Sequence, residues 1–201
     1  MVSGVEERKG GAVNTSAARI LTGITVARIV LVPAIMALVL LGDEHRYAYA
    51  AATVLFVVAA LTDFVDGYLA RRWSLTTTLG AFLDTTADKL LVSGALIALV
   101  AVDRVSAWIV VIIISRELAV LALRGMVAAE GRLMVPSIWG KLKANVQFVA
   151  VSLAMVRVSW RLGGLHPDEW VMLAAAVITV FSAIEYFNRF GAALTPSPPD
   201  E

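Results

Sequence analysis

The sequence is divided into apolar runs that are each long enough to cross a lipid bilayer. A transmembrane helix needs about 20 predominantly apolar residues. Stretches of this length, separated by charged or turn-forming residues, occupy residues 20–41, 47–70, 80–102, 106–127, 141–160 and 170–190. The sequence therefore predicts an all-α integral membrane protein with six transmembrane helices.

The composition agrees with this fold class. Hydrophobic residues make up 59% of the chain and charged residues only 16%, whereas a soluble domain carries about 25% charged residues. The net charge of +1 provides no global field for nucleic acid, so we expect no nucleic-acid partner. The absence of cysteine excludes disulfides, thiolate catalysis and cysteine-ligated zinc or iron–sulfur centres.

The distribution of Lys and Arg predicts the orientation of the chain. Ten of these residues flank the termini or lie in the second and fourth loops, against four in the other loops. This bias predicts a multi-pass protein of the cell inner (plasma) membrane with both termini in the cytoplasm. We expect residues 1–18 to form a flexible cytoplasmic tail, residues 19–191 the six-helix membrane catalytic domain, and residues 192–201 a disordered tail.

Four aspartates lie where the second predicted helix ends and the third begins. Asp63 and Asp66 are three residues apart and Asp84 and Asp88 are four apart, so each pair lies on one face of its helix. A short basic loop joins the two helices, which are expected to be antiparallel neighbours with both pairs at the same cytoplasmic level. Four carboxylates this close would repel one another at low dielectric unless cations lie among them. Oxygen-only ligands favour Mg²⁺ or Mn²⁺.

Two other interpretations of these charges remain open. The aspartates could be interfacial charges paired with Arg71, Arg72 and Lys89, or they could line the pathway of a divalent-cation transporter. A charge within the bilayer costs at least about 2.5 kcal/mol, which makes four such residues candidates for function. Small residues on the same faces, such as Gly67 and Gly80, would let a ligand approach closely.

The pattern D-x2-D-G-x2-A-R-x8-G-x3-D-x3-D, complete from Asp63 to Asp88, resembles that of the CDP-alcohol phosphotransferases. The resemblance implies six transmembrane helices around a polar cavity open to the cytoplasm, usually in a homodimer. It also implies two metal ions, one held by Asp63, Asp66 and Asp84 and one by Asp63, Asp84 and Asp88. Asp88 would be the general base. Three residues would contact the CDP moiety, namely Gly67, Arg71 and Thr77.

Three further stretches resemble one branch of this family, the bacterial phosphatidylglycerophosphate synthases. Residues 21–33 are similar to its L-T-x-x-R-I…P opening, which implies that Thr25 and Arg28 also bind CDP-diacylglycerol. Residues 115–124 and 139–147 are similar to its S-R-E…L-R…G-K-x-K-T…Q pattern. The resemblance therefore implies glycerol 3-phosphate as the acceptor.

Cationic residues of the fourth and fifth predicted helices are candidates for binding this anionic acceptor. Arg116 lies near the middle of its helix, where a guanidinium must face a partner or a wet cavity. Its neighbour Glu117 is expected to point about 100° away and to be a poor partner. Lys141 and Lys143 flank the start of the fifth helix, and Arg124 completes the set. Positive-inside topology is the alternative explanation for Arg124, Arg132 and Lys143.

The expected function is transfer of the phosphatidyl group from CDP-diacylglycerol, embedded in membrane lipid, to glycerol 3-phosphate. The products would be phosphatidylglycerophosphate and CMP, in phospholipid biosynthesis. Metal ions would bridge phosphate oxygens and offset charge developing in an in-line displacement. Alternative acceptors are phosphatidylglycerol, as in a cardiolipin synthase, and inositol phosphate.

Overall fold

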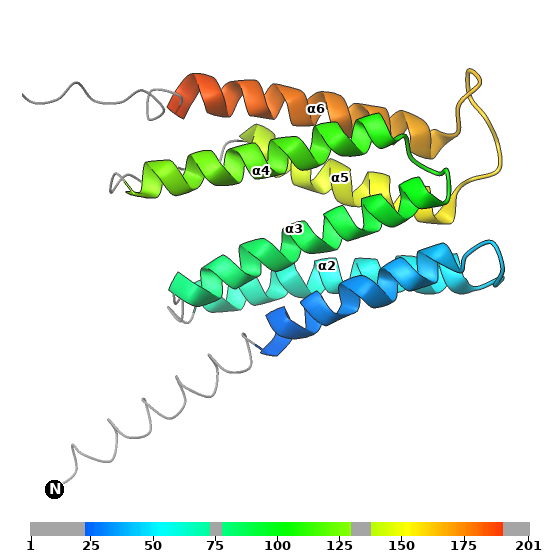
Figure 1. The fold of residues 1–201 in the computed structure, drawn as a ribbon, viewed down its shortest axis with the longest axis horizontal. Helices are drawn as coiled ribbons and strands as arrows, with labels where there is room; N and C mark the ends of the chain where they lie inside the picture. Colours follow the sequence, from blue (N-terminus) through cyan, green and yellow to red (C-terminus); the bar gives the residue numbers. More distant parts are fainter. Residues whose placement is uncertain (1–22, 73–77, 130–137, 191–201) are drawn as a thin grey trace, which may run out of the picture. The chain divides into compact units, whose positions relative to one another are not determined.

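The computed structural model describes residues 23–72, 78–129 and 138–190, except for the side chains of residues 63–72, 78–82, 84 and 141. The described residues fold into helices and their connections (Figure 1). The chain divides into two compact units, residues Met1–Ala95 and Leu96–Glu201. The prediction of an all-α chain is confirmed for the described residues.

The first unit contains the helix Gly23–Leu40, helix α2 (Ala48–Arg72) and most of helix α3 (Thr78–Ala101). Its core is apolar and includes Ile35, Phe56 and Leu91, which are almost completely buried. Gly94 of α3 allows a close approach to the first helix, because a Cβ atom there would lie 2.6 Å from Val32 Cγ1. The small residue therefore fixes how tightly these two helices pack.

The second unit contains α4 (Ala107–Ala129), α5 (Ile138–Val156) and α6 (Pro167–Phe190). Helix α6 packs against both α4 and α5, and the three run alongside one another (Figure 1). Val120, Leu123 and Val127 of α4 form an apolar cluster with Tyr186 of α6. Apolar residues therefore fill the contact between α4 and α6 toward the ends of both helices.

Polar contacts cap the helices of the second unit. Arg104 Nη1 donates hydrogen bonds to the carbonyls of Ala154 (3.2 Å) and Met155 (2.7 Å), which occupy the last turn of α5 and lack partners within the helix. Glu169 accepts a hydrogen bond from the His166 N–H at 2.7 Å, as in a capping box at the start of α6. Both ends of the α5–α6 connection are thereby fixed.

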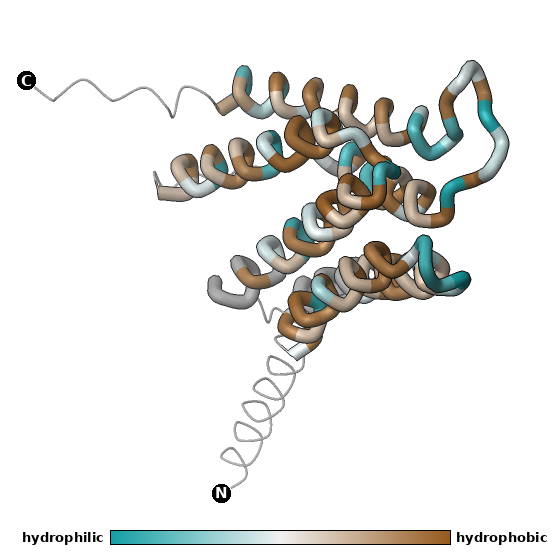
Figure 2. The backbone as a smooth tube through the Cα atoms, turned by 45° about the vertical axis from the view of Figure 1, so that its right-hand side comes forward, coloured by the Kyte–Doolittle hydropathy of each residue, from teal (hydrophilic) through white to brown (hydrophobic). Residues whose placement is uncertain are grey.

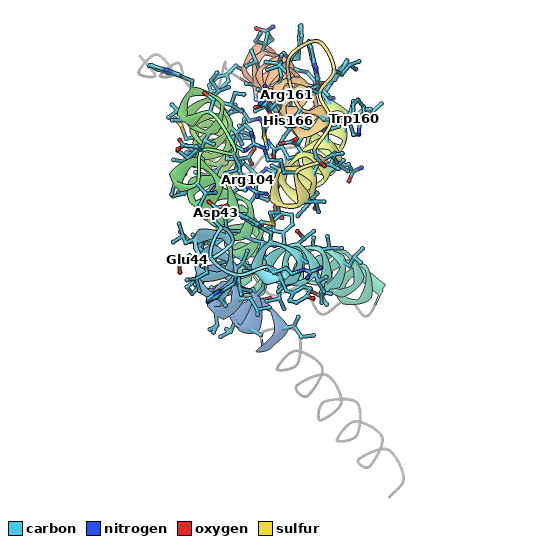
Figure 3. The ribbon with its side chains drawn as sticks, turned by 90° about the vertical axis from the view of Figure 1, so that its right-hand side faces the viewer. Asp43, Glu44, Arg104, Trp160, Arg161 and His166 are labelled. Atoms are coloured by element: carbon cyan, nitrogen blue, oxygen red, sulfur yellow. The ribbon has the colours of Figure 1, made fainter. Side chains whose placement is uncertain are left out.

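The connection between α5 and α6 differs from the prediction. We expected the fifth helix to continue to residue 160, but α5 ends at Val156, because Arg157 adopts a left-handed conformation (φ 46°). Trp160 therefore lies in the connection, which also brings Arg161 Nε within 3.1 Å of His166 Nε2 (Figure 3). His166, the last residue of this connection, is buried.

Hydrophobic residues predominate along the described helices, and hydrophilic residues are most frequent in the connections and at helix ends (Figure 2). Large hydrophobic side chains such as Val30, Trp108 and Ile138 are more than half exposed, a distribution that suits lipid rather than water as the surroundings. Among the described helices, Gly23–Leu40 and Pro167–Phe190 are long and apolar enough to cross a membrane. These features support a membrane protein, and the count of six spans stays a prediction.

Candidate functional site

The two aspartate pairs lie on consecutive helices at matching positions. Asp63 and Asp66 belong to α2, and Asp84 and Asp88 belong to α3. Asp66 lies six residues before the last residue of α2, and Asp84 lies six residues after the first residue of α3. At 1.5 Å per residue, both are about 9 Å along the helix axis from the ends that residues 73–77 connect.

This register fits a shared cation site, because antiparallel packing of α2 and α3 would bring the two pairs to one level. The side chains of Asp63, Asp66, Asp84 and Arg71 lie outside the described residues, as do the surroundings of Gly67 and the whole of Thr77. Asp88 is half-buried and follows the fully buried Ala87. A donor set of carboxylate oxygens alone suits Mg²⁺ or Mn²⁺.

Thr25 and Arg28 are buried in the first unit. They lie one helical turn apart on the helix Gly23–Leu40, with exposed fractions of 7% and 2%. A buried guanidinium requires compensation by polar or anionic groups, since its desolvation is costly. The two residues proposed from the opening motif therefore face the interior of their unit and not the surrounding lipid.

A cluster of three charged side chains lies between the helices of the second unit. Glu117 Oε1 accepts a hydrogen bond from Arg116 Nη1 at 3.2 Å and another from Lys143 Nζ of α5. Arg116 Nη2 donates to Ser182 Oγ of α6 at 2.6 Å. The side chains of Arg116, Glu117 and Lys143 are exposed by only 9%, 7% and 8%. We call Arg116, Glu117, Lys143 and Ser182 the interhelical cluster.

The prediction that Glu117 is a poor partner for Arg116 is wrong. The angle between neighbouring Cα–Cβ bonds separates only the stems of the two side chains. Lys143 draws the Glu117 carboxylate into the contact between α4 and α5, and the long Arg116 side chain reaches the same oxygen. The sequence reasoning missed Glu117 as a site residue, although it lies within the S-R-E stretch and in a predicted span.

The interhelical cluster carries more positive than negative charge, because two cations share one carboxylate. The Arg116 guanidinium carbon also lies 5.5 Å from the centroid of the Tyr186 ring, which favours a cation at that position. Arg116 Nε is buried and has no hydrogen-bond partner among the described residues. An anion is therefore the ligand that this arrangement favours.

A second polar layer lies one turn further along α5. Gln147 Nε2 donates to Thr179 Oγ1 of α6 at 3.0 Å, and Thr179 Oγ1 donates to the Ala175 carbonyl at 2.6 Å. Both side chains are buried. Gln147 and Lys143 are four residues apart and share a face of α5, so this buried polar contact lies next to the interhelical cluster.

The remaining acceptor candidates are placed differently. Arg124 is exposed on α4, eight residues beyond Arg116, and makes no ion pair with any described side chain. Lys141 lies in the first turn of α5, and its side chain is outside the described part. Of the four predicted acceptor-binding residues, the structure brings Arg116 and Lys143 together.

Comparison with known proteins identifies the class to which this fold and these residues belong. Residues 20–181 match the model of the CDP-alcohol phosphatidyltransferase family, a range that includes all four aspartates and the whole interhelical cluster except Ser182. The chain therefore belongs to the CDP-alcohol phosphatidyltransferase family of enzymes. The resemblance inferred from the sequence is confirmed.

Individual relatives cover most of the chain. The CDP-diacylglycerol–glycerol-3-phosphate 3-phosphatidyltransferase of Bacillus subtilis (strain 168) is 42% identical over 185 residues, covering 87% of this chain and 96% of the relative. The protein of the same name from Escherichia coli (strain K12) is 37% identical over 186 residues, covering 86% of this chain and 95% of the relative. The Haemophilus influenzae protein of that name is 36% identical over 172 residues, covering 82% and 89%.

Proposed function

We propose that this protein transfers the phosphatidyl group from CDP-diacylglycerol to glycerol 3-phosphate, giving phosphatidylglycerophosphate and CMP. The main support for glycerol 3-phosphate as the acceptor is the buried interhelical cluster, in which two cations share one carboxylate. Two cations attract a phosphate monoester, and the Arg116 guanidinium offers it donors in matching geometry. The names of the three relatives support the same reaction.

The four aspartates hold two divalent ions, Mg²⁺ or Mn²⁺, in this proposal. Members of this family generally depend on a divalent metal, and such ions neutralise charge on phosphate oxygens during displacement. Asp63 and Asp84 contribute to both ions, Asp66 to the first and Asp88 to the second. The register of the pairs on α2 and α3 supports this assignment.

The reaction is an in-line displacement at phosphorus. The hydroxyl oxygen of the acceptor forms a bond to the phosphorus nearest diacylglycerol, while the bond from that phosphorus to the bridging oxygen breaks. CMP leaves with the bridging oxygen, and Asp88 accepts the hydroxyl proton as general base. Five residues bind the CDP-diacylglycerol substrate, namely Gly67, Arg71, Thr77, Thr25 and Arg28.

The acceptor site is formed by Arg116 and Lys143 together with Lys141 and Arg124. Arg116 and Lys143 lie on neighbouring helices and are both less than one-tenth exposed. Burial strengthens their attraction for a phosphate, because less water competes for the charge. Arg124, which is exposed, would attract the acceptor at longer range.

The proposed setting is a six-helix catalytic domain, residues 19–191, in the inner membrane. The polar cavity opens to the cytoplasm, where both termini lie. Glycerol 3-phosphate and the CDP headgroup of CDP-diacylglycerol enter the cavity from that side. Membrane lipid surrounds the apolar helix surfaces. The functional assembly is a homodimer in this proposal.

The test is CMP release from CDP-diacylglycerol by the purified protein in detergent with each candidate acceptor. We expect release with glycerol 3-phosphate and none above background with phosphatidylglycerol or inositol phosphate. Asp84→Asn serves as the inactive control. Release only with another acceptor would overturn the proposed reaction within the family, and metal flux in liposomes without CMP release would favour a transporter.

A further inference from the structure

Glu117 has a position that the proposed reaction leaves unexplained. It is a buried carboxylate in a site that must attract an anion, and it would by itself repel a phosphate group. A single oxygen of Glu117 accepts from two cationic side chains on two different helices. Without this oxygen the cations of Arg116 and Lys143 would repel each other and separate.

The Arg116 guanidinium is held on three sides. Nη1 donates to Glu117 Oε1, Nη2 donates to Ser182 Oγ, and the guanidinium carbon lies over the Tyr186 ring, 5.5 Å from its centroid. These contacts use two of the five N–H donors that a guanidinium carries. Nε–H is among the three that are left, and it has no partner among the described residues.

We infer that Glu117 is a positioning residue, which holds Lys143 beside Arg116 and orients the guanidinium so that its Nε–H meets the phosphate of the acceptor. Glu117 does not contact the substrate. It fixes the guanidinium plane and keeps a second positive charge beside it, which lowers the reorganisation needed when the anion binds. This inference rests on the proposed function, because it assigns the anion to the acceptor.

The arrangement also explains why the acid is Glu and why it follows Arg116 directly. The carboxylate must reach across the contact between α4 and α5 to meet Lys143 while remaining within reach of its own neighbour. An Asp at this position is one methylene shorter and would reach at most one of the two cations. A negative charge at position 117 is therefore not sufficient, because the side chain must also be long enough to contact both cations.

A double-mutant cycle tests the inference. Glu117→Gln keeps an oxygen acceptor of the same length and removes the charge. We expect it to raise the KM for glycerol 3-phosphate about 10-fold, equivalent to about 1.4 kcal/mol, with the KM for CDP-diacylglycerol and kcat changed less than about twofold. Glu117→Asp retains the negative charge, but its KM for glycerol 3-phosphate should still be higher than that of the wild-type protein. In an Arg116→Ala background, Glu117→Gln should raise the KM for glycerol 3-phosphate by a smaller factor than in the wild-type protein, because of the two cation contacts only that with Lys143 is then left to lose.

Direct titration of glycerol 3-phosphate in a calorimeter supplies a readout that needs no turnover, and the Kd should follow the KM in each variant. Glu44→Gln is the matched control, since it removes the same charge from an exposed connection. An unchanged KM and Kd in folded Glu117→Gln protein would overturn the inference, as would effects that add fully to those of Arg116→Ala. If the wild-type protein uses a different acceptor, the proposed function fails, and the same cycle with that acceptor still decides the role of Glu117.

Discussion

Arg116 of α4 and Ser182 of α6 are joined by a hydrogen bond of 2.6 Å from Nη2 to Oγ. The two residues are 66 positions apart in the sequence, so their contact depends on the packing of α6 against α4. Ser182 is completely buried. The orientation of the guanidinium is therefore determined by tertiary structure as well as by its own helix.

The first prediction concerns this contact. Ser182→Ala should raise the KM for glycerol 3-phosphate by up to about 10-fold, because a hydrogen bond to a charged group contributes about 1.5 kcal/mol. Ser152→Ala is the control, since Ser152 Oγ donates only to the Phe148 carbonyl within its own helix. Equal KM values for the two variants would show that Ser182 does not orient Arg116.

The second prediction concerns the cations themselves. Arg116→Ala and Lys141→Ala should each raise the acceptor KM about 10- to 150-fold, corresponding to a lost charge-assisted contact of about 1.5–3 kcal/mol. The KM for CDP-diacylglycerol should change far less. Arg116→Lys should restore binding poorly, because an ammonium cannot reproduce a planar fork of donors. Unchanged acceptor KM values in both alanine variants would place the phosphate elsewhere.

Metal dependence is the third prediction. Removal of divalent cations with EDTA should abolish CMP release, and added Mg²⁺ or Mn²⁺ should restore it. Asp63→Asn and Asp84→Asn should abolish activity while the protein still inserts into the membrane, because each removes a carboxylate assigned to both ions. Full turnover after confirmed metal removal would contradict the two-ion assignment.

The orientation of the chain gives the fourth prediction. Reporter fusions within residues 72–79 and 128–139 should report a cytoplasmic location, since Lys and Arg concentrate on that side. A fusion in the α5–α6 connection, residues 157–166, should report the opposite side. Labelling of either cytoplasmic segment by a membrane-impermeant reagent from outside would disprove the six-helix topology.

The fifth prediction concerns packing in the first unit. Gly94→Ala should lower the free energy of unfolding by about 1–3 kcal/mol, because the added Cβ would lie 2.6 Å from Val32 Cγ1 and 3.2 Å from Met36 Sδ. Gly125→Ala is the matched helical control. Apart from its chain neighbours and the nearby backbone of its own helix, no atom lies within 4 Å of the Cβ it would add, so we expect a neutral or slightly stabilising effect. Thermal unfolding in detergent measures both.

The helices could be predicted from the sequence because long apolar runs and their charged breaks are local properties. The end of α5 could not, because the left-handed conformation of Arg157 replaces helical geometry within a stretch that still contains apolar residues. The aspartate motif is also local, and its register on α2 and α3 follows from spacing alone. The role of Glu117 could not be predicted, because its partner Lys143 is 26 residues away and meets it only when α4 and α5 both pack against α6.

The contact of one Glu117 oxygen with two cations has a consequence for the insertion of α4 into the membrane. Helix α4 carries Arg116 and Glu117 side by side, and each charge would cost about 2.5–3.5 kcal/mol at the centre of a bilayer. Pairing within α4 reduces this cost, and the contacts with Lys143 and Ser182 become available only after α5 and α6 have been synthesised. During biosynthesis α4 should therefore remain beside the insertion machinery and enter the lipid together with the two helices that follow it.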